Sequence, residues 1–414
     1  MSEQNEVLAK IKFLVGDRGI IAECGRIPVL PAFSVEAVAF LSDLSRELLS
    51  IKGIRSHRDV LSYAYWIRKA SIERERQKTT DIDTRVGRGV AFHIAPSNVP
   101  VNFAVSMTSS LLAGNITVIR VSNKEFEEVD IICNAINKLL EKPEHEVIKK
   151  YICIIRYDHS DQVTEYLSSV CDLRIIWGGD ATIKEIRRFP IPSRAVEMCF
   201  ADRYSMAVID AKKYLRKSKE IAEETARKFY TDTYYSDQNA CSSPRILIWV
   251  TGDIAAEDLD VCRETFWGAL QKEADERYDM KPVQAIDKLS NFTELAMKSD
   301  KPVTINKRNN KLFVIDINEA DSDIFNYKTG GGFFFQYAVK NLDEIIPFLE
   351  KQCQTVAVFG IEKSEVVGLV RQSGVRGVDR VVDIGDTMGL EFVWDGYRMV
   401  ENMSRVIYVY DKSK

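Results

Sequence analysis

Histidine is scarce in this sequence, and the motifs that commonly hold zinc are absent. There are four histidines, His57, His93, His145 and His159, with no His-Glu-x-x-His motif, and the eight cysteines include no Cys-x-x-Cys pair. These absences argue against a zinc site, and we expect no metal. No Gly-x-Ser-x-Gly motif occurs, which argues against a Ser-His-Asp hydrolase. Catalysis should therefore rest on another nucleophile.

Long apolar runs and a large charge imbalance are also missing. No window approaches 18 uninterrupted apolar residues, and the first residues, MSEQNEVLAKIKFLVGDRG, lack the basic segment and apolar core of a secretory signal. The net charge of −4 comes from interspersed charges of both signs, which argues against nucleic acid as a partner. Scattered cysteines suit a reducing compartment. We expect a cytoplasmic protein without a transmembrane segment.

The length of the chain is sufficient for two hydrophobic cores, because 414 residues exceed what one core usually holds. Apolar, strand-like runs alternate with helical periodicity over residues 87–210, which is typical of βαβ units in a mainly parallel sheet. The pattern repeats after residue 205. We predict an α/β fold with an N-terminal segment and dinucleotide-binding domain at 1–204, a catalytic domain at 205–390, and a C-terminal segment at 391–414 that returns to the first domain or to a partner subunit.

The same patterns predict individual elements. Residues 1–35 should form short strands and turns, residues 35–80 helices, and residues 211–230 one long helix. Buried strands are predicted within GRGVAFHIAPSNVP, ITVIRVS, YICIIRY, LRIIWGG, SMAVID, ILIWV, residues 312–316 and TVAVFG. The aromatic segments at 265–267, 333–335 and 392–394 are expected to be core rather than the lining of an acyl tunnel.

Cys241 stands out among the candidate nucleophiles. It lies in DQNACSSPR, residues 237–245, between a predicted helix and a predicted strand and among small polar residues. Backbone N–H groups can approach a thiol in such a loop, where they lower its pKa and stabilise charge on an attacked carbonyl. A structural cysteine would show the same local pattern, so this segment alone leaves both readings open.

Three further segments follow the ends of predicted strands. Pro96-Ser97-Asn98-Val99-Pro100 follows the first strand, Arg120 ends the second, and Gly178-Gly179-Asp180-Ala181-Thr182 leads into a helix. Ligands of open α/β sheets bind outside the carboxyl ends of the strands. The Asn98 amide can donate to an oxyanion, Arg120 suits a ribose or its phosphate, and a helix N-terminus favours phosphate. Turn formation and a solvated charge are the structural alternatives.

Five segments, in this order along the chain, resemble the aldehyde dehydrogenase superfamily. The resemblance is closer to its acyl-CoA reductase branch of the bioluminescence type, the reductase of bacterial fatty acid reductase complexes. The segments are GVAFHIAPSNVP, SLLAGNITVIRVSN, IIWGGDATIKEIR, DQNACSSPR and GVDRVVDIGDTMGLEFVWDGYRMVENMSR. They run from about residue 85 to the C-terminus. The resemblance implies an aldehyde dehydrogenase-like fold with two doubly wound α/β lobes and the active site in the cleft between them.

The resemblance also implies roles for single residues. Cys241 matches the catalytic cysteine, and Asn98 matches the asparagine whose amide helps to form the oxyanion hole. Glu197 lies near the general-base glutamate of the hydrolytic members, although the surrounding Glu-Leu-Gly-Gly pattern is absent. The run Gly330–Phe335 replaces the Glu-x-Phe-Gly-Pro segment that holds the nicotinamide ribose. The implied cofactor-binding residues are Pro96, Ser97, Arg120, Gly178, Gly179, Asp180 and Thr182.

The implied reaction is the NADPH-dependent reduction of an acyl-CoA, with a fatty acyl group, to the aldehyde. It proceeds through an acyl-cysteine with coenzyme A as the leaving group, and NADH is the alternative cofactor. The resemblance further implies a homo-oligomer, and an acyl-protein synthetase as a partner. Three alternatives remain open: a CoA-acylating aldehyde dehydrogenase acting mainly in the oxidative direction, a thioesterase in which water cleaves the acyl-cysteine, and an acyl carrier that docks the synthetase.

Overall fold

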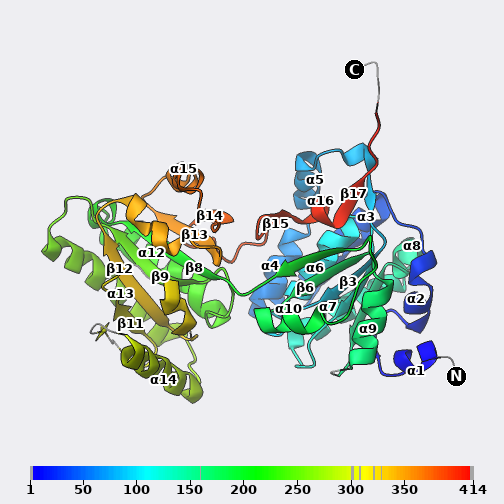
Figure 1. The fold of residues 1–414 in the computed structure, drawn as a ribbon, viewed down its shortest axis with the longest axis horizontal. Helices are drawn as coiled ribbons and strands as arrows, with labels where there is room; N and C mark the ends of the chain where they lie inside the picture. The colour runs from blue at the N-terminus through cyan, green and yellow to red at the C-terminus, as the bar shows by residue number, and fades with distance from the viewer. Residues whose placement is uncertain are drawn as a thin grey trace. The chain divides into compact units, whose positions relative to one another are not determined.

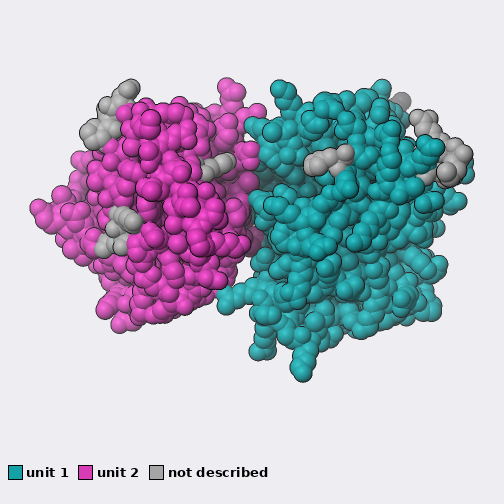
Figure 2. Space-filling view, turned by 90° about the horizontal axis from the view of Figure 1, so that it is seen from below, with its two compact units in different colours: residues 1–201, 390–414 teal, residues 202–389 magenta. Residues whose placement is uncertain are grey.

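The protein divides into two compact units, each built on its own sheet (Figure 1). The computed structural model describes residues 3–158, 160–299, 303–306, 309–319, 322–327 and 329–410, so His159 lies outside the described residues. Unit 1 holds residues 1–201 and 390–414, and unit 2 holds residues 202–389 (Figure 2). Among the helices of the described ranges, none has the length and apolar character needed to cross a membrane.

Unit 1 contains a six-stranded sheet in the order β1-β5-β4-β3-β6-β7. The strands are β1 (Lys12–Val15), β3 (Val90–Ile94), β4 (Ile116–Arg120), β5 (Ile152–Arg156), β6 (Leu173–Trp177) and β7 (Val196–Phe200). Every neighbouring pair is parallel except β1 with β5. The chain runs outward from β3 to β4 and β5, and then crosses back to β6 on the other side of β3. Because such crossovers are right-handed, the connecting helices cover both faces of the sheet, which explains why the central strands are continuous apolar runs.

Helices and two small antiparallel pairs complete unit 1. The helices are α1 (Glu3–Leu8), α2 (Arg18–Glu23), α3 (Val35–Ser50), α4 (Arg58–Trp66), α5 (Lys69–Lys78), α6 (Asn102–Leu112), α7 (Glu127–Leu140), α8 (Glu146–Lys149), α9 (Asp161–Val170), α10 (Asp180–Ile186) and α16 (Met399–Met403). β15 (Val393–Trp394) pairs with β16 (Tyr397–Arg398), and β17 (Ser404–Val406) pairs with β2 (Arg85–Gly87). The C-terminal segment therefore pairs within unit 1.

Unit 2 contains a seven-stranded sheet in the order β10-β11-β12-β9-β8-β13-β14, parallel except at β10. Its strands are β8 (Tyr204–Asp210), β9 (Pro244–Val250), β10 (Thr304–Ile305), β11 (Phe313–Asp316), β12 (Phe333–Val339), β13 (Cys353–Phe359) and β14 (Arg380–Asp383). Its helices are α11 (Ala211–Leu215), α12 (Lys219–Thr233), α13 (Ala256–Arg277), α14 (Pro282–Lys298) and α15 (Lys363–Ser373). Side chains alternate along each strand, so Trp249 of β9 joins one core with α12 and α13, while Ile248 joins a second core on the opposite face.

The predicted α/β fold with mainly parallel sheets is confirmed, and each predicted buried strand is present. Two local predictions were wrong. Residues 1–35, predicted as short strands and turns, contain the helices α1 and α2. Asp17 caps α2 by accepting hydrogen bonds from Gly19 N at 2.7 Å and Ile20 N at 3.3 Å. The helix predicted over 211–230 is split into α11 and α12, with Ser218 extended between them. The three aromatic segments contribute core residues, as expected, among them Phe266, Phe334 and Phe392.

Candidate active site

Cys241 lies in a turn at the amino edge of the unit 2 sheet, three residues before β9 begins. Its thiol is half-buried, whereas six of the other seven cysteines are buried. The carbonyl of Cys241 accepts a hydrogen bond of 2.7 Å from Ser205 Oγ at the start of β8. Ser205 Oγ in turn accepts from the backbone N–H of Thr355 in β13, at 3.2 Å. The position of Cys241 is thus fixed to two neighbouring parallel strands.

The other thiols are poorly suited to nucleophilic attack. Burial raises the pKa of Cys133, Cys171 and Cys353 to about 12, and that of Cys199 and Cys262 to about 11. Burial also raises the pKa of Cys24 and Cys153. Because the thiolate is the reactive form, these seven cysteines are poor nucleophiles at neutral pH. Cys241 is the thiol that the structure leaves as a candidate.

The turn before Cys241 is held by the side chain of Gln238, which is completely buried. Gln238 and Asp237 both have a left-handed backbone, with φ of 55° and 52°. Gln238 Oε1 accepts from the backbone N–H groups of Gly332 at 2.7 Å and Phe333 at 3.0 Å, and its Nε2 donates to the Phe333 carbonyl at 3.1 Å. These bonds bind the cysteine turn to the glycine-rich run at the start of the neighbouring strand, β12.

The close approach of the two segments requires glycine at position 332. Gly332 has a φ of 88°, and a Cβ there would lie 2.1 Å from the Lys311 carbonyl oxygen and 2.5 Å from Tyr234 Oη. We expect Gly332→Ala to lower the free energy of unfolding by at least about 2 kcal/mol. Gly268→Ala is the control, because Gly268 lies within α13 with no atom within 4 Å of an added Cβ. It should raise the free energy of unfolding by roughly 0.5–1 kcal/mol. Chemical denaturation measures both, and equal effects would contradict this reading.

The opposite side of the cysteine turn contacts the loop 385–388. Met388 Sδ accepts hydrogen bonds from Ser242 Oγ at 3.7 Å and Ser243 Oγ at 4.0 Å. Asp232 of α12 anchors this loop, because its fully buried carboxyl group accepts from Gly385 N at 2.6 Å and Thr387 N at 3.1 Å. Burial raises the pKa of Asp232 to about 7, against the lowering effect of those two bonds.

The raised pKa of Asp232 predicts a pH-dependent stability. Folding favours the protonated carboxyl, so the contribution of Asp232 is full below the ordinary pKa of 3.8 and is lost as the pH rises through about 7. An asparagine at this position would not ionise, so Asp232→Asn should gain stability relative to the wild type by a few kcal/mol between pH 5 and pH 8. Denaturant unfolding of both proteins at each pH measures this difference. A difference that does not change with pH would contradict the prediction.

The residues predicted to bind the cofactor share one edge of the unit 1 sheet. Ile94 at the end of β3 pairs in register with Arg120 of β4 and Ile176 of β6, so the loops that follow these three strands leave the sheet side by side. One loop carries Pro96, Ser97 and Asn98, and Asn98 is exposed at a bend. The chain turns to opposite sides after β3 and β6. This is the topological switch point at which open α/β sheets bind dinucleotides.

Arg120 provides a test of whether these residues fit a dinucleotide. Its guanidinium carbon lies 5.0 Å from the centroid of the Tyr157 ring, and its buried Nε has no hydrogen-bond partner among the described residues. Gly178 and Gly179 separate β6 from α10, and a Cβ on Gly178 would press against the Thr182 side chain at 3.0 Å. A guanidinium group whose Nε lacks a hydrogen-bond partner among the described residues, and two glycines between β6 and α10 at the switch point, fit a phosphate-bearing cofactor.

Comparison with known proteins places the chain in a family. A family model described as "Acyl-CoA reductase (LuxC)" matches residues 26–406. The chain belongs to this acyl-CoA reductase family. Membership confirms the family suggested by the sequence segments.

The relatives that match this acyl-CoA reductase family member are distant and longer. The long-chain acyl-protein thioester reductase of Aliivibrio fischeri is 23% identical over 305 residues, which is 72% of this chain and 58% of that protein. The protein of the same description from Vibrio harveyi is 24% identical over 310 residues, 72% of this chain and 59% of that protein. The chain thus spans less than two thirds of the length of these relatives.

Solved structures show the fold that this family member shares with aldehyde dehydrogenases. A lactaldehyde dehydrogenase superimposes with a TM-score of 0.64 at 12% identity, covering 95% of this chain and 91% of the other. The NADP-dependent glyceraldehyde-3-phosphate dehydrogenase of Bacillus halodurans C-125, complexed with NADP, gives a TM-score of 0.61 at 14% identity, covering 97% and 90%. The predicted aldehyde dehydrogenase-like fold is confirmed.

Glu197, the candidate general base, is engaged in ion pairs in this acyl-CoA reductase family member. It lies on β7, where Oε2 accepts from Arg174 Nε at 2.9 Å and Oε1 accepts from Arg187 Nε at 2.7 Å. Burial acts to raise the pKa of Glu197, but the hydrogen bonds from Arg187 and Arg174 outweigh it and hold the pKa below its ordinary value. A carboxylate stabilised by two guanidinium groups is a weak base. The geometry argues against the suggested role.

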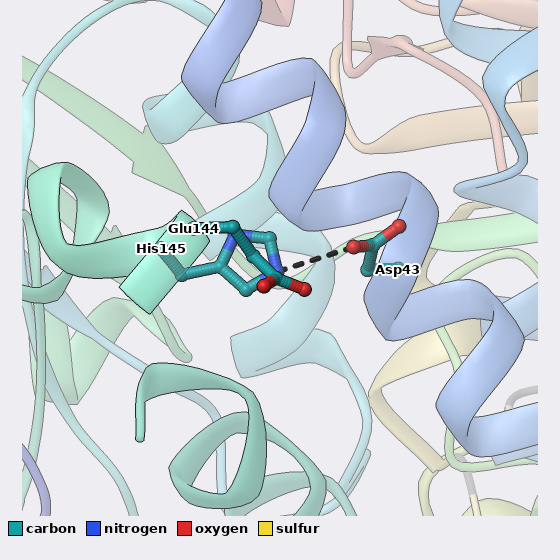
Figure 3. A group of neighbouring side chains, drawn as sticks. All are labelled: Asp43, Glu144 and His145. Carbon is teal, nitrogen blue, oxygen red and sulfur yellow. Dashed lines mark ion pairs between the residues drawn. The ribbon is translucent and has the colours of Figure 1, made fainter. Parts of the chain in front are cut away.

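A group of three potential metal ligands lies elsewhere in unit 1, formed by Asp43, Glu144 and His145 (Figure 3). Asp43 belongs to α3, and the other two belong to the short helix η4 (Pro143–His145). His145 Nε2 lies 3.2 Å from Asp43 Oδ2, and Asp43 also pairs with Arg46. Glu144 is exposed. Among the described residues, nothing beyond these contacts points to a bound ion, and we assign no metal to this group.

Two buried cations near Cys241 were not identified from the sequence. Arg245 follows Cys241 by four residues, and Lys288 belongs to α14, a helix that the sequence patterns did not reveal. Lys288 is completely buried and donates to the Gly331 carbonyl. Burial lowers the pKa of Lys288 to about 8, while Asp237 acts to raise it. Arg245 could have been identified from the sequence, because it is a basic residue in the same segment, DQNACSSPR, as the candidate nucleophile.

Proposed function

We propose that this protein reduces a long-chain acyl thioester to the aldehyde through an acyl intermediate on Cys241. The observation that carries the proposal is the setting of Cys241, a half-buried thiol fixed by hydrogen bonds at the amino edge of the unit 2 sheet. Membership of the acyl-CoA reductase family supports it. So do the names of the relatives, which are described as long-chain acyl-protein thioester reductases.

In the proposed mechanism the thiolate of Cys241 attacks the carbonyl carbon of the thioester. A C–S bond to Cys241 forms, the carbonyl becomes a tetrahedral oxyanion, and the C–S bond to the leaving thiol breaks as the oxyanion collapses. The leaving thiolate takes a proton from solvent. The Asn98 amide and the backbone N–H of Cys241 are the proposed donors to the oxyanion, each worth about 3–4 kcal/mol in comparable sites.

A nicotinamide cofactor fits the switch point of the unit 1 sheet. Arg120, the loop from Pro96 to Asn98, and the segment from Gly178 to Thr182 are the residues proposed to hold it. When bound, the reduced nicotinamide would supply the hydride that converts the acyl group to the aldehyde, while the C–S bond to Cys241 breaks and the Cys241 thiolate is regenerated. The positive charge of Arg120 favours NADPH over NADH in this proposal, because a 2′-phosphate would pair with it.

The fate of the acyl group depends on excluding water. A hydrolytic enzyme needs a base that activates water, and the ion pairs of Glu197 with Arg174 and Arg187 hold this carboxylate in its weakly basic form. Reduction is therefore proposed over hydrolysis.

The acyl donor is proposed to be a fatty acyl-CoA, with coenzyme A leaving, or a fatty acyl group on a partner protein such as an acyl-protein synthetase. A homo-oligomer is part of the same proposal.

The test follows nicotinamide fluorescence with purified protein, NADPH or NADH, and acyl-CoAs of increasing chain length. A second series replaces the acyl-CoA with an acylated carrier protein. Loss of fluorescence that requires an acyl thioester, with aldehyde as the product, supports the reductase. Release of the carrier thiol without any need for nicotinamide would identify a thioesterase. Activity only from aldehyde, NADP and coenzyme A would identify the oxidative direction, and no turnover in any series would favour the acyl carrier.

A further inference from the structure

Arg245 is a buried guanidinium located directly behind the Cys241 turn. It belongs to β9, and its exposed fraction is 9%. Nη1 donates to the Thr329 carbonyl at 2.9 Å, and Nη2 donates to the Gln238 carbonyl. One side chain therefore joins the left-handed turn before Cys241 to the segment that precedes the glycine-rich run.

Both acceptors of Arg245 are uncharged carbonyl groups. Over the residues that the structure describes, no carboxylate pairs with it or with the buried Arg85 and Arg156, whereas the buried Arg174 pairs with Glu197 at 2.5 Å. Burying an uncompensated charge costs several kcal/mol. Carbonyl dipoles offset part of that cost, and an anion that forms close by would offset more.

Cys241 is the group that can supply this negative charge. Cys241 precedes Arg245 by four residues. The Arg245 guanidinium donates a hydrogen bond to the carbonyl of Gln238, which belongs to the same turn as Cys241. We propose that Arg245 is a positioning residue that fixes the Cys241 turn and, as a buried cation without a carboxylate partner among the described residues, favours the thiolate form of Cys241. The inference rests on the proposed role of Cys241 as nucleophile. Burial lowers the pKa of Arg245 to about 10, while the electrostatic interaction with Cys241 acts to raise it.

Other titratable groups on the elements that pack against the turn have partners of their own. Asp237 accepts a hydrogen bond from Tyr278, and Lys288 donates one to the Gly331 carbonyl. Asp232 accepts hydrogen bonds from the loop 385–388, which also contains Asp386. Arg203 forms an ion pair with Asp379. Lys288 is the second buried cation of the region, but its charge is directed at Asp237 and the glycine-rich run. The charge of Arg245 also interacts with Cys241 itself.

The test measures the alkylation rate of Cys241 by iodoacetamide against pH, with the Cys241-containing peptide quantified by mass spectrometry. Only the thiolate reacts, so the midpoint of this profile reports the proton equilibrium of Cys241, with the proton released to solvent. Removing a nearby positive charge raises a thiol pKa by roughly one unit or more. We expect Arg245→Gln to shift the midpoint upward and to slow alkylation about tenfold below both midpoints. Arg245→Lys keeps the charge and should recover most of the wild-type rate.

Arg156→Gln is the matched control. Arg156 is equally buried, at 9%, but it belongs to β5 of unit 1. Its replacement should change stability without moving the alkylation profile of Cys241. A folded Arg245→Gln protein whose profile coincides with that of the wild type would overturn the proposal. So would an Arg245→Lys protein that reacts as slowly as Arg245→Gln, because position rather than charge would then be responsible.

A measurement on the wild type keeps the proposal testable if Arg245→Gln does not fold. The same peptide is alkylated in the native protein and in the urea-unfolded protein. We expect the native midpoint to be lower, and a native midpoint at or above the unfolded one would contradict the inference. Alkylation needs neither acyl thioester nor nicotinamide. A negative result in this test would therefore contradict the role of Arg245 without contradicting the reductase proposal. If the protein had no reductase activity, the alkylation profile would still report the proton equilibrium of Cys241.

Discussion

Cys241→Ala is expected to abolish acyl-enzyme formation and to lower the rate of aldehyde formation at least ~10³-fold. The physical reason is the loss of the thiol that the structure leaves as a candidate nucleophile, because burial raises the pKa of the other seven. The measurement is nicotinamide oxidation with a long-chain acyl thioester at saturating cofactor. Circular dichroism and thermal unfolding establish that the variant folds, since alanine removes one sulfur atom from a half-buried turn.

Cys199→Ala is the matched control for this experiment. Cys199 is the other half-buried thiol, but it lies on β7 of unit 1, within reach of Arg187 and Glu197. Its removal should leave the reduction rate close to that of the wild type. Normal aldehyde formation by Cys241→Ala, or its loss in Cys199→Ala alone, would show that the nucleophile has been assigned to the wrong residue.

Asn98→Ala is expected to lower kcat about 10²–10³-fold while changing KM little. The proposed amide donor acts on the oxyanion that forms during the reaction, so its loss affects the transition state more than substrate binding. Asn98 is exposed at a bend after β3, so the fold should tolerate the change. Steady-state kinetics with the acyl-CoA of highest activity provide the measurement.

Asn137→Ala is the control for the Asn98 variant. Asn137 is exposed on α7 and its amide donates to the Leu14 carbonyl at 2.9 Å, away from the carboxyl ends of β3 and β6. Its replacement should leave kcat near the wild-type value. A loss at Asn98 that appears in KM with kcat unchanged would instead assign Asn98 to ground-state binding.

The regular elements of the fold were predictable because their side-chain patterns are strong. The buried parallel strands are continuous apolar runs, and helices such as α3 and α9 have clear amphipathic periodicity. β12 was not identified as a strand, because its Phe333-Phe334-Phe335 start follows three glycines that indicated an interruption. In the structure these glycines form the turn that meets Gln238, and all three phenylalanines are buried.

The candidate site was predictable at single residues but not as a network. The position of Cys241 among small polar residues and the strand-end positions of Asn98 and Arg120 were legible in the sequence. The contacts that surround Cys241 join segments far apart in sequence, such as Gln238 with Phe333 and Asp232 with Thr387. Local patterns carry no information about such pairs. Glu197 illustrates the reverse case, because its two arginine partners were not foreseeable from its own segment.

The most direct test of the proposed function is mass spectrometry of the protein after incubation with a long-chain acyl-CoA in the absence of nicotinamide. The proposed mechanism predicts one acyl group on the Cys241-containing peptide, which disappears on addition of NADPH with the release of an equal amount of aldehyde. An acyl group on another residue, no acyl group at all, or an acyl group released as free acid at the same rate with and without NADPH would contradict it.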